Sequence, residues 1–329
     1  MNNFKTESFD LNRAFLLDSS HPPSSIVTKL HPLNKIMAEG QIHEDIPLLV
    51  MELDNQAIAF ITPQLAYQHI VQGVLNGQAW LVSFCSICNG GAVFSPLVDD
   101  EVYSFQEGGF YDAMVLLYDV QSGSYWDHLT GNCLYGSLVG KELKRLSNLL
   151  HMSLRQVLAA YPDALLALSA LPEQQQTEAE EDEAWRKASE PEWSKGLVKT
   201  LGVEDNRLPR LNMGLGVWTE TTRRYYPVAQ LYAMNNVLID MVDGQRLITY
   251  IDPLSGTPGA FFTDASQAEW QHNILQLNNG DSMRDMVIFD ANMMLKRPQR
   301  PFQLFVRWYS FALKFPNCEI YGQPVNTQG

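Results

Sequence analysis

An apolar run from Ala79 to Phe84, rich in aromatic and branched side chains, marks the centre of the amino-terminal half of the chain. Such a run predicts a buried strand. It ends at Cys85-Ser86-Ile87-Cys88, and the following Asn89-Gly90-Gly91 tolerates the positive φ of a tight turn. A second short strand then starts at Ala92. The pattern is strand, two cysteines, glycine turn and strand, which differs from a thioredoxin-type cysteine pair because that pair begins a helix.

The alternation of apolar and polar residues predicts further elements around this hairpin. Leu48 to Leu53 and Ala57 to Phe60 flank Asp54-Asn55, a combination that is typical of a β-hairpin. A helix is expected to begin at Thr62-Pro63, with the threonine as N-cap, and to end at about Gln72. Later in this half, the sequence predicts strands at Val102–Phe105 and Ala113–Asp119 and a helix at Ser153–Ala160.

Two segments interrupt this pattern. Residues 1–45 contain His21-Pro22-Pro23 and His31-Pro32, which favour extended or turn conformations, so we expect an irregular arm there. Between Glu173 and Glu192, eight acidic residues face two basic ones, which gives a local charge of 2 − 8 = −6. This stretch predicts a solvated linker or an exposed helix.

The hydrophobic pattern returns after about Leu211. Residues 236–261 align without gaps on residues 69–94 at an offset of 167, which places Gly244-Gln245 on Gly77-Gln78. Apolar positions correspond along the aligned stretch, and a helix ending in an aromatic-proline pair closes each half. We interpret the chain as a tandem duplication.

The two halves differ at the cysteines. Cys85 and Cys88 fall on Asp252 and Ser255, while a turn glycine persists at Gly256. A turn that is kept without thiols does not need them for its shape. Any chemistry of the cysteines therefore belongs to the first copy.

The sequence thus predicts an α+β protein with two related, small, mostly antiparallel sheets, each with a packed helix. The expected segments are an irregular arm (1–45), a first repeat domain with the two-cysteine turn (46–171), an acidic linker (172–210) and a second, degenerate repeat domain (211–329). A chain of 329 residues is long enough for two such domains.

Composition narrows the classes of function. The net charge is 23 − 37 = −14, which argues against binding to nucleic-acid backbones or anionic membranes. No apolar run approaches the length of a membrane span, and the first residues carry no secretory pattern. Four cysteines in a chain of this size do not make a disulfide framework. We expect a cytoplasmic protein with reduced thiols.

Cys85 and Cys88 are the leading candidates for chemistry. Two residues between them allow both sulfurs to reach one ion from a single turn, and thiolates favour copper(I), zinc or iron. The alternative is a pair of buried, inert thiols, since free cysteine packs as a small apolar residue. The glycine-flanked turn favours a metal site, here with copper or zinc.

His128 is the leading third ligand or general base, because it lies in a turn-rich segment beside Asp127, which could orient the imidazole. A surface histidine in a loop is an equally good interpretation of the same residue. Trp126 is expected to form a pocket wall or part of the core. Cys133 is a reserve ligand only.

These motifs resemble a bacterial family of unknown function, the domain-of-unknown-function family numbered 3179. The similar segments are the run from Cys85 to Gly90, the strand Leu117-Tyr118-Asp119, the run from Ser124 to Gly131, and the run from Tyr250 to Gly256 with aspartate and serine in place of cysteine. The resemblance covers roughly residues 46–321 apart from the linker. It implies no activity, because the family is defined without one.

The residues favour the hypothesis of a metal-dependent enzyme, an oxidoreductase. Cys85, Cys88 and His128 would hold copper or zinc. Asp127 and His128 would assist catalysis on an unknown small-molecule or peptide substrate. The first alternative is a metal-handling or protein-interaction module without turnover. The second is a thiol-disulfide redox protein, which would form a reversible bond between the two cysteines and bind no metal.

Overall fold

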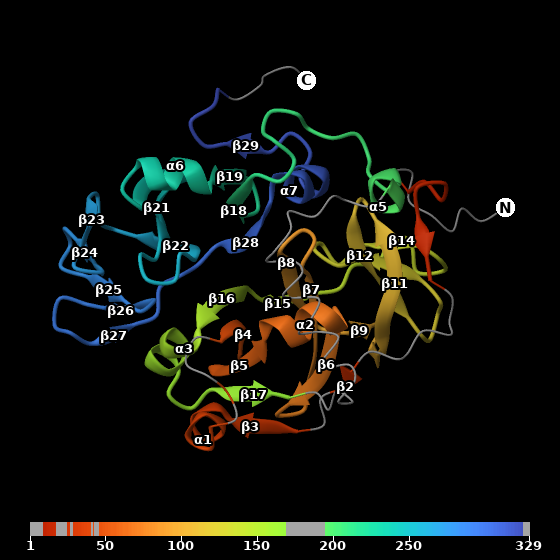
Figure 1. Cartoon of the computed structure of the whole chain (residues 1–329), viewed down its shortest axis with the longest axis horizontal. Helices are drawn as coiled ribbons and strands as arrows, with labels where there is room; N and C mark the ends of the chain where they lie inside the picture. The colour runs from red at the N-terminus through yellow and green to blue at the C-terminus, as the bar shows by residue number, and fades with distance from the viewer. Residues whose placement is uncertain are drawn as a thin grey trace.

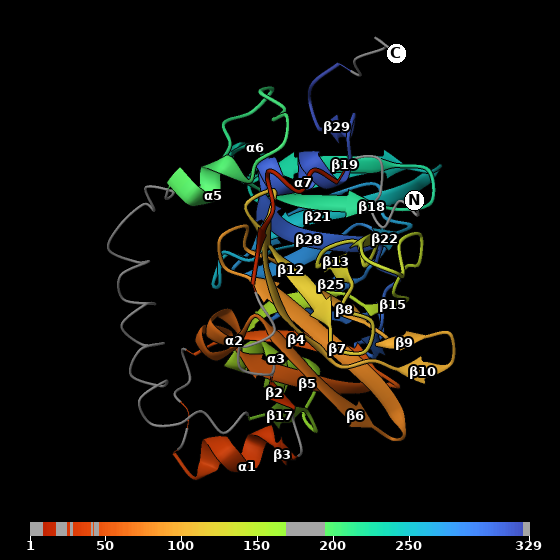
Figure 2. The ribbon, with the colours of Figure 1, turned by 90° about the vertical axis from the view of Figure 1, so that its right-hand side faces the viewer.

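The computed structural model describes residues 9–17, 25–26, 29–40, 42, 46–168 and 195–324. Strands dominate and most strand pairs are antiparallel, so the sheet-rich α+β class predicted from the sequence is confirmed. The described residues form seven sheets rather than the two expected, because the connections between the main strands fold into sheets of their own. Figures 1 and 2 show the first half in orange to yellow-green and the second half in green to blue.

The first half begins with a hairpin, a short helix and a three-stranded meander. These elements are β4 (Pro47–Leu53), β5 (Gln56–Ile61), α2 (Thr62–Gln68), β6 (Ile70–Leu75), β7 (Gln78–Cys85) and β8 (Gly90–Phe94). The helix is shorter than predicted. His69 has a φ of 58°, which ends the helix, and Ile70-Val71 then pair with β7 instead of continuing it.

The second half repeats this order of elements and pairings. It contains β18 (Met213–Trp218), β19 (Arg223–Pro227), α6 (Val228–Ala233), β20 (Val237–Val242), β21 (Gln245–Ile251) and β22 (Pro258–Thr263). In both halves the first two strands form one antiparallel hairpin and the last three form one antiparallel meander.

Each half is completed by a strand, a helix and a short strand that return to its first hairpin. In the first half these are β16 (Leu149–Ser153), α3 (Leu154–Ala160) and β17 (Leu165–Ala167), and in the second half β28 (Phe302–Arg307), α7 (Trp308–Lys314) and β29 (Glu319–Ile320). β16 and β28 pair antiparallel with β4 and β18, while β17 and β29 pair parallel with β5 and β19. Ser153 caps α3 through a capping box with Gln156.

The connection between meander and closing strand differs in the two halves. In the first half it forms β9 (Leu97–Val98), β10 (Glu101–Val102), β11 (Phe105–Tyr111), β12 (Met114–Asp119), β13 (Tyr125–Asp127), β14 (Cys133–Tyr135) and β15 (Arg145–Ser147). In the second half it forms one meander of β23 (Ala268–Gln271), β24 (Ile274–Leu277), β25 (Ser282–Arg284), β26 (Val287–Phe289) and β27 (Leu295–Lys296).

The described parts of residues 1–45, which we expected to be irregular, extend sheets of the first half. They form β1 (Phe15–Leu16), β2 (Ser25–Ile26), β3 (Leu30–Pro32) and α1 (Leu33–Ala38), and the three strands pair with β11, β6 and β17. Pro32 is the last residue of β3 and directly precedes α1. Its ring fixes a φ of −58°, which a helix also has, but its ψ of 121° is extended. The predicted acidic run lies outside the described residues, which resume at the first residue of α5 (Lys195–Lys199).

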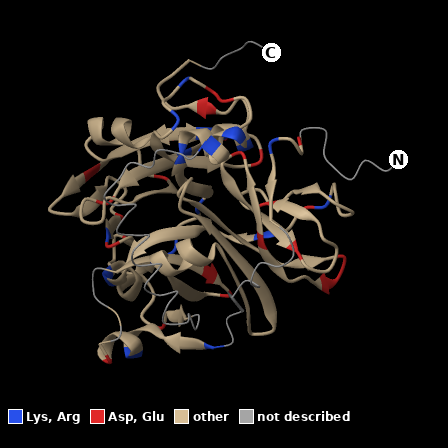
Figure 3. Ribbon diagram, turned by 45° about the vertical axis from the view of Figure 1, so that its right-hand side comes forward, with Lys and Arg blue, Asp and Glu red and all other residues tan. Residues whose placement is uncertain are grey.

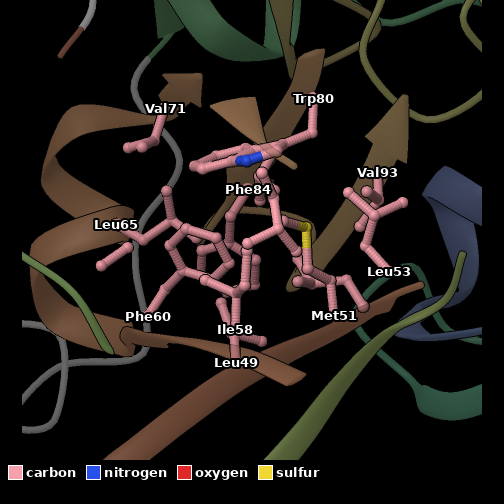
Figure 4. Close-up of a cluster of buried hydrophobic side chains, with 14 of the residues drawn as sticks. Leu49, Met51, Leu53, Ile58, Phe60, Leu65, Val71, Trp80, Phe84 and Val93 are labelled. Atoms are coloured by element: carbon pink, nitrogen blue, oxygen red, sulfur yellow. The ribbon is translucent and has the colours of Figure 1, made fainter. Parts of the chain in front are cut away.

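A buried cluster fixes the meander of the first half to its hairpin. Figure 4 shows the side chains that converge there, including those of Met51, Phe60, Trp80 and Phe84. The rings of Phe60 and Trp80 pack edge to face with their centres 5.6 Å apart. The end of β7, which carries Cys85, therefore stands on a rigid base.

Candidate metal centre

The two cysteines lie on a turn between antiparallel strands, as the sequence predicted. Cys85 is the last residue of β7, β8 begins at Gly90, and Asn89 adopts the positive φ of 59° that the turn needs. No helix follows the cysteine pair in this described segment. The second half holds the turn in place, since Asn89 donates a side-chain hydrogen bond to the carbonyl of Phe305 (2.9 Å) and Arg307 N–H donates to the carbonyl of Cys88 (3.0 Å).

The structure brings Cys85, Cys88 and His128 together. Their sulfur and imidazole nitrogen atoms all lie within 4.8 Å of one another, and all three residues are buried. The Cys88 Sγ is 3.7 Å from His128 Nε2. No fourth cysteine, histidine, aspartate or glutamate joins this cluster in the part of the chain that the structure describes.

The spacing of these donors fits ligands of a single ion. For metal–sulfur and metal–nitrogen bonds of about 2.3 and about 2.05 Å, a sulfur and a nitrogen ligand lie about 3.6 Å apart in tetrahedral geometry and about 3.8 Å apart in trigonal geometry. The separation of 3.7 Å between Cys88 Sγ and His128 Nε2 falls between these values. The backbone N–H of Gly90 also donates to Cys88 Sγ (3.3 Å), which stabilises negative charge on that sulfur.

His128 is positioned by a tight loop between β13 and β14. Asp127 accepts hydrogen bonds at Oδ1 from the backbone N–H groups of Leu129 (2.9 Å) and Thr130 (2.8 Å), and its carbonyl accepts from Gly131 N–H (2.9 Å). The buried hydroxyl of Ser83, on β7, donates to the carbonyl of His128 (2.9 Å). The loop is thereby tied to the strand that carries Cys85.

Two cations from outside this loop also hold it. Lys314 on α7 contacts Asp127 Oδ2 (2.7 Å) and Asp112 Oδ2 (3.0 Å), and all three side chains are largely buried. Arg145 donates a hydrogen bond to the carbonyl of Leu129. Asp112 lies in the turn between β11 and β12, and Figure 1 shows α7 near the ends of these strands. The loop thus depends on contacts between the two halves.

Burial raises the pKa of both thiols, but the interaction between the two thiols shifts their pKa values in opposite directions. A thiolate on Cys85 accepts a hydrogen bond from Cys88, and this bond is the largest of the effects that lower the pKa of Cys85 well below its ordinary value. The pKa of Cys88 is raised by burial and by the hydrogen bond and charge of Cys85. The pair therefore loses its first proton readily and its second reluctantly, unless a cation is bound.

The histidine and the aspartate have pKa values suited to a ligand and to its support. Burial lowers the pKa of His128, which keeps the imidazole neutral and able to bind a metal. Burial alone would raise the pKa of Asp127, but the charge of Lys314 outweighs it and the pKa falls to about 2. Asp127 is therefore an anion across the physiological range.

The sequence of this chain matches the family model described as Protein of unknown function (DUF3179) over residues 30–295. The chain belongs to this family. No match is found among curated proteins or among solved structures.

Within this DUF3179 chain, the role expected for Asp127 needs refinement. Its carboxylate contacts the loop backbone and Lys314, and no hydrogen bond joins it to the imidazole of His128. The Nδ1 atom of His128 is buried without a hydrogen-bond partner among the described residues. Asp127 therefore orients the histidine through the shape of the loop rather than through a direct bond to the ring.

Trp126 and Cys133 lie in a different buried cluster of the DUF3179 chain from that of the paired cysteines. The indole of Trp126 donates to Asp119 Oδ2 (2.8 Å) and its ring packs against Phe105, which is a core role. Burial raises the pKa of Cys133 to about 12. The structure does not bring either residue to the candidate metal centre.

Sequence reasoning missed Lys314 and Arg145, and it gave His69 no part in the site. The Nδ1 atom of His69 lies 3.2 Å from Oε2 of Glu107, and a positive charge on His69 would lower the pKa of Cys85. In the sequence, Lys314 stands out only as the single charged residue at the end of a mostly apolar helix. That pattern is a weak indication of a buried charge.

The corresponding turn of the second half has the same hydrogen bonds with oxygen in place of sulfur. The Ser255 hydroxyl donates to Asp252 Oδ1 (3.1 Å), and Thr257 N–H donates to Ser255 Oγ (3.3 Å), as Gly90 N–H does to Cys88 Sγ. Gln156 of α3 contacts Ser255 (3.1 Å) across the two halves. The turn shape is thus independent of the thiols.

We expect Ser83→Ala to lower the free energy of unfolding by about 1 to 3 kcal/mol, because it leaves the buried carbonyl of His128 without its hydrogen bond. The matched control is Thr249→Val in the second half, where the hydroxyl is buried without a partner among the described residues. Its loss should be neutral or stabilising. Urea denaturation of both variants measures the difference, and equal effects would show that the Ser83 bond does not hold the loop.

In the described residues there is no helix with both the length and the apolar character needed to cross a membrane.

Proposed function

We propose that the protein binds one copper or zinc ion through Cys85, Cys88 and His128 and acts as a metal-dependent oxidoreductase. The observation that carries the proposal is the convergence of two sulfurs and one imidazole within 4.8 Å, from segments about 40 residues apart in the sequence. A lone cysteine pair is only half of a metal site. His128 supplies the third donor, a neutral imidazole beside the two thiols, and the three donors together suit one metal ion.

The number of donors supports a catalytic role. Catalytic metal sites keep three protein ligands and leave one position for water or substrate, whereas structural zinc sites use four. The described residues supply three. A bound ion would supply Lewis acidity or, in the case of copper, one-electron chemistry. Asp127 and Lys314 would hold the histidine in place, and the apolar side chains around the cysteines would exclude water.

The complete burial of both sulfurs favours a second candidate, an ion that is cargo or a structural clip. Cys85 and Cys88 are 0 % exposed, and Met114, Leu129 and Tyr309 belong to the same buried cluster. A substrate would need a local opening to reach the ion. Thiol-disulfide exchange is a third candidate, supported by the hydrogen-bonded pair of free thiols.

We also propose that the chain arose by tandem duplication, with the metal site retained only in the first copy. The repeated order of elements, the offset of 237 − 70 = 167 between the first residues of β20 and β6, and the matching hydrogen bonds of the two turns support this. The replacement of thiol and thiol by carboxylate and hydroxyl removes the soft ligands and keeps the turn.

X-ray absorption spectroscopy of the metal-loaded protein tests the proposed function. We expect two sulfur neighbours at about 2.3 Å and one imidazole nitrogen at about 2.05 Å. An additional oxygen neighbour that added azide displaces would support the oxidoreductase, and a fourth protein ligand would support the clip. A protein that takes up no metal but forms a reversible Cys85–Cys88 disulfide, seen by mass spectrometry, would contradict both.

A further inference from the structure

A cavity of about 720 Å³ lies between the two halves, away from the cysteine turn. Its first-half walls come from β4, β16 and the end of α3, and its second-half walls come from the end of β18 and the segment 295–302. Cavities of this size at an interface between domains are the usual form of a small-molecule site. None of the candidate metal ligands lines it.

The charge of this cavity is opposite to that of the chain. Four basic residues line it, against two acidic ones, in a protein whose net charge is −14. The basic residues are Arg223, Lys296, Arg297 and Arg300, and the acidic residues are Glu52 and Glu220. Figure 3 shows basic and acidic residues dispersed over the ribbon as a whole. The excess of cations in this cavity is therefore a local feature.

Two of these cations are already neutralised. Arg297 contacts both carboxylate oxygens of Glu52 at 3.0 Å, and Lys296 contacts Asp281 at 2.6 Å. Arg223 and Arg300 instead donate to backbone carbonyls, those of Thr219, Glu220 and Thr222 for the first and that of Ala260 for the second. Neither forms an ion pair with a carboxylate within the described residues, so both guanidinium charges remain available to an anion.

The rest of the wall is suited to a flat apolar group. The rings of Trp218 and Phe302 stack with centres 5.5 Å apart and planes at 25°, and the guanidinium of Arg145 lies 4.9 Å from the centre of the Trp218 ring. Phe262 also lines the cavity. The hydroxyl of Ser147, another lining residue, is buried without a hydrogen-bond partner among the described residues, so it can serve a polar ligand atom.

We propose that this cavity binds a small organic anion with a carboxylate or phosphate head and a flat apolar body. Arg223 and Arg300 bind the head, since a guanidinium presents paired N–H donors that match both groups. Trp218 and Phe302 contact the body. The inference does not depend on the metal centre, and metal-free protein is equally suitable for its test.

The test uses two fluorescent probes, the anionic 8-anilinonaphthalene-1-sulfonate and the neutral N-phenyl-1-naphthylamine, which share a flat apolar body. We expect Arg223→Gln and Arg300→Gln each to weaken binding of the anionic probe by about tenfold, the effect of losing one charge-assisted hydrogen bond. Binding of the neutral probe should change by less than about twofold, because it makes no such bond. Phenyl phosphate should displace the anionic probe.

Two controls test whether the probe binds in this cavity. Arg246→Gln removes an exposed arginine outside the cavity and should leave both probes unaffected. Trp218→Phe should reduce energy transfer from tryptophan to the bound probe more than Trp270→Phe does, because Trp218 lines the cavity and Trp270 does not. The proposal is wrong if the anionic probe binds Arg223→Gln and Arg300→Gln as tightly as the unaltered protein, or if Trp218→Phe leaves the energy transfer intact.

Discussion

Lys314→Met is expected to lower the free energy of unfolding by about 3 to 5 kcal/mol. The buried Lys314 forms ion pairs with Asp112 and Asp127. Its removal leaves the buried carboxylate of Asp127 without a counter-charge, whereas Asp112 keeps its ion pair with Arg13 (2.8 Å). Methionine keeps most of the length of the side chain, so the change tests charge more than packing. Urea denaturation with a common slope gives the difference.

The matched control for this variant is Lys141→Met. Lys141 also forms an ion pair with an aspartate, Asp99, at 2.6 Å, but both side chains are exposed to solvent. Its loss should cost less than about 1 kcal/mol. A loss for Lys314→Met no larger than that for Lys141→Met would mean that the buried pairs do not hold the loop that carries His128.

His128→Ala is expected to weaken the binding of zinc or copper(I) by more than about 100-fold. The basis is that changing only an outer-shell partner of a metal ligand already costs about 10- to 100-fold in affinity. His128 is one of three donors in the cluster, so its loss leaves only the two thiols. Competition with a chromophoric chelator under anaerobic conditions measures the affinity.

His151→Ala controls for the loss of a packed histidine ring. The ring of His151 contacts those of Phe84 and Phe305, but His151 is not part of the donor cluster. Burial lowers the pKa of His151 to about 4, so it also packs as a neutral ring. His151 also forms a hydrogen bond with the backbone of Asn89, so this variant reports any indirect effect on the cysteine turn. A metal affinity of His128→Ala equal to that of the unaltered protein would exclude His128 as a ligand.

The parts of this site that the sequence predicted are local. One hairpin contains the apolar run, the two cysteines Cys85 and Cys88 and the turn residues. Its shape could therefore be predicted from this segment alone. His128 was a candidate because of its residue type and its turn-rich surroundings. The sequence contained no information on its distance from the thiols, and the structure supplies it as 3.7 Å to Cys88.

The parts that the sequence did not predict arise from contacts between distant segments. Lys314 follows Asp127 by 314 − 127 = 187 positions, and Arg145 reaches the same loop from another sheet. Pairings of this kind depend on how the two halves pack, which hydrophobic periodicity does not encode. The same reason explains Trp126, whose residue type fitted a pocket wall while its position in the sheet placed it in the core.

The central claim is that Cys85, Cys88 and His128 hold one metal ion. Elemental analysis of anaerobically purified protein tests it most directly. The unaltered chain is compared with Cys85→Ser and with Cys318→Ser, which changes a buried cysteine that is not one of the three donors. We expect about one ion per chain in the unaltered protein and in Cys318→Ser, and almost none in Cys85→Ser. Equal metal content in all three samples would contradict the claim.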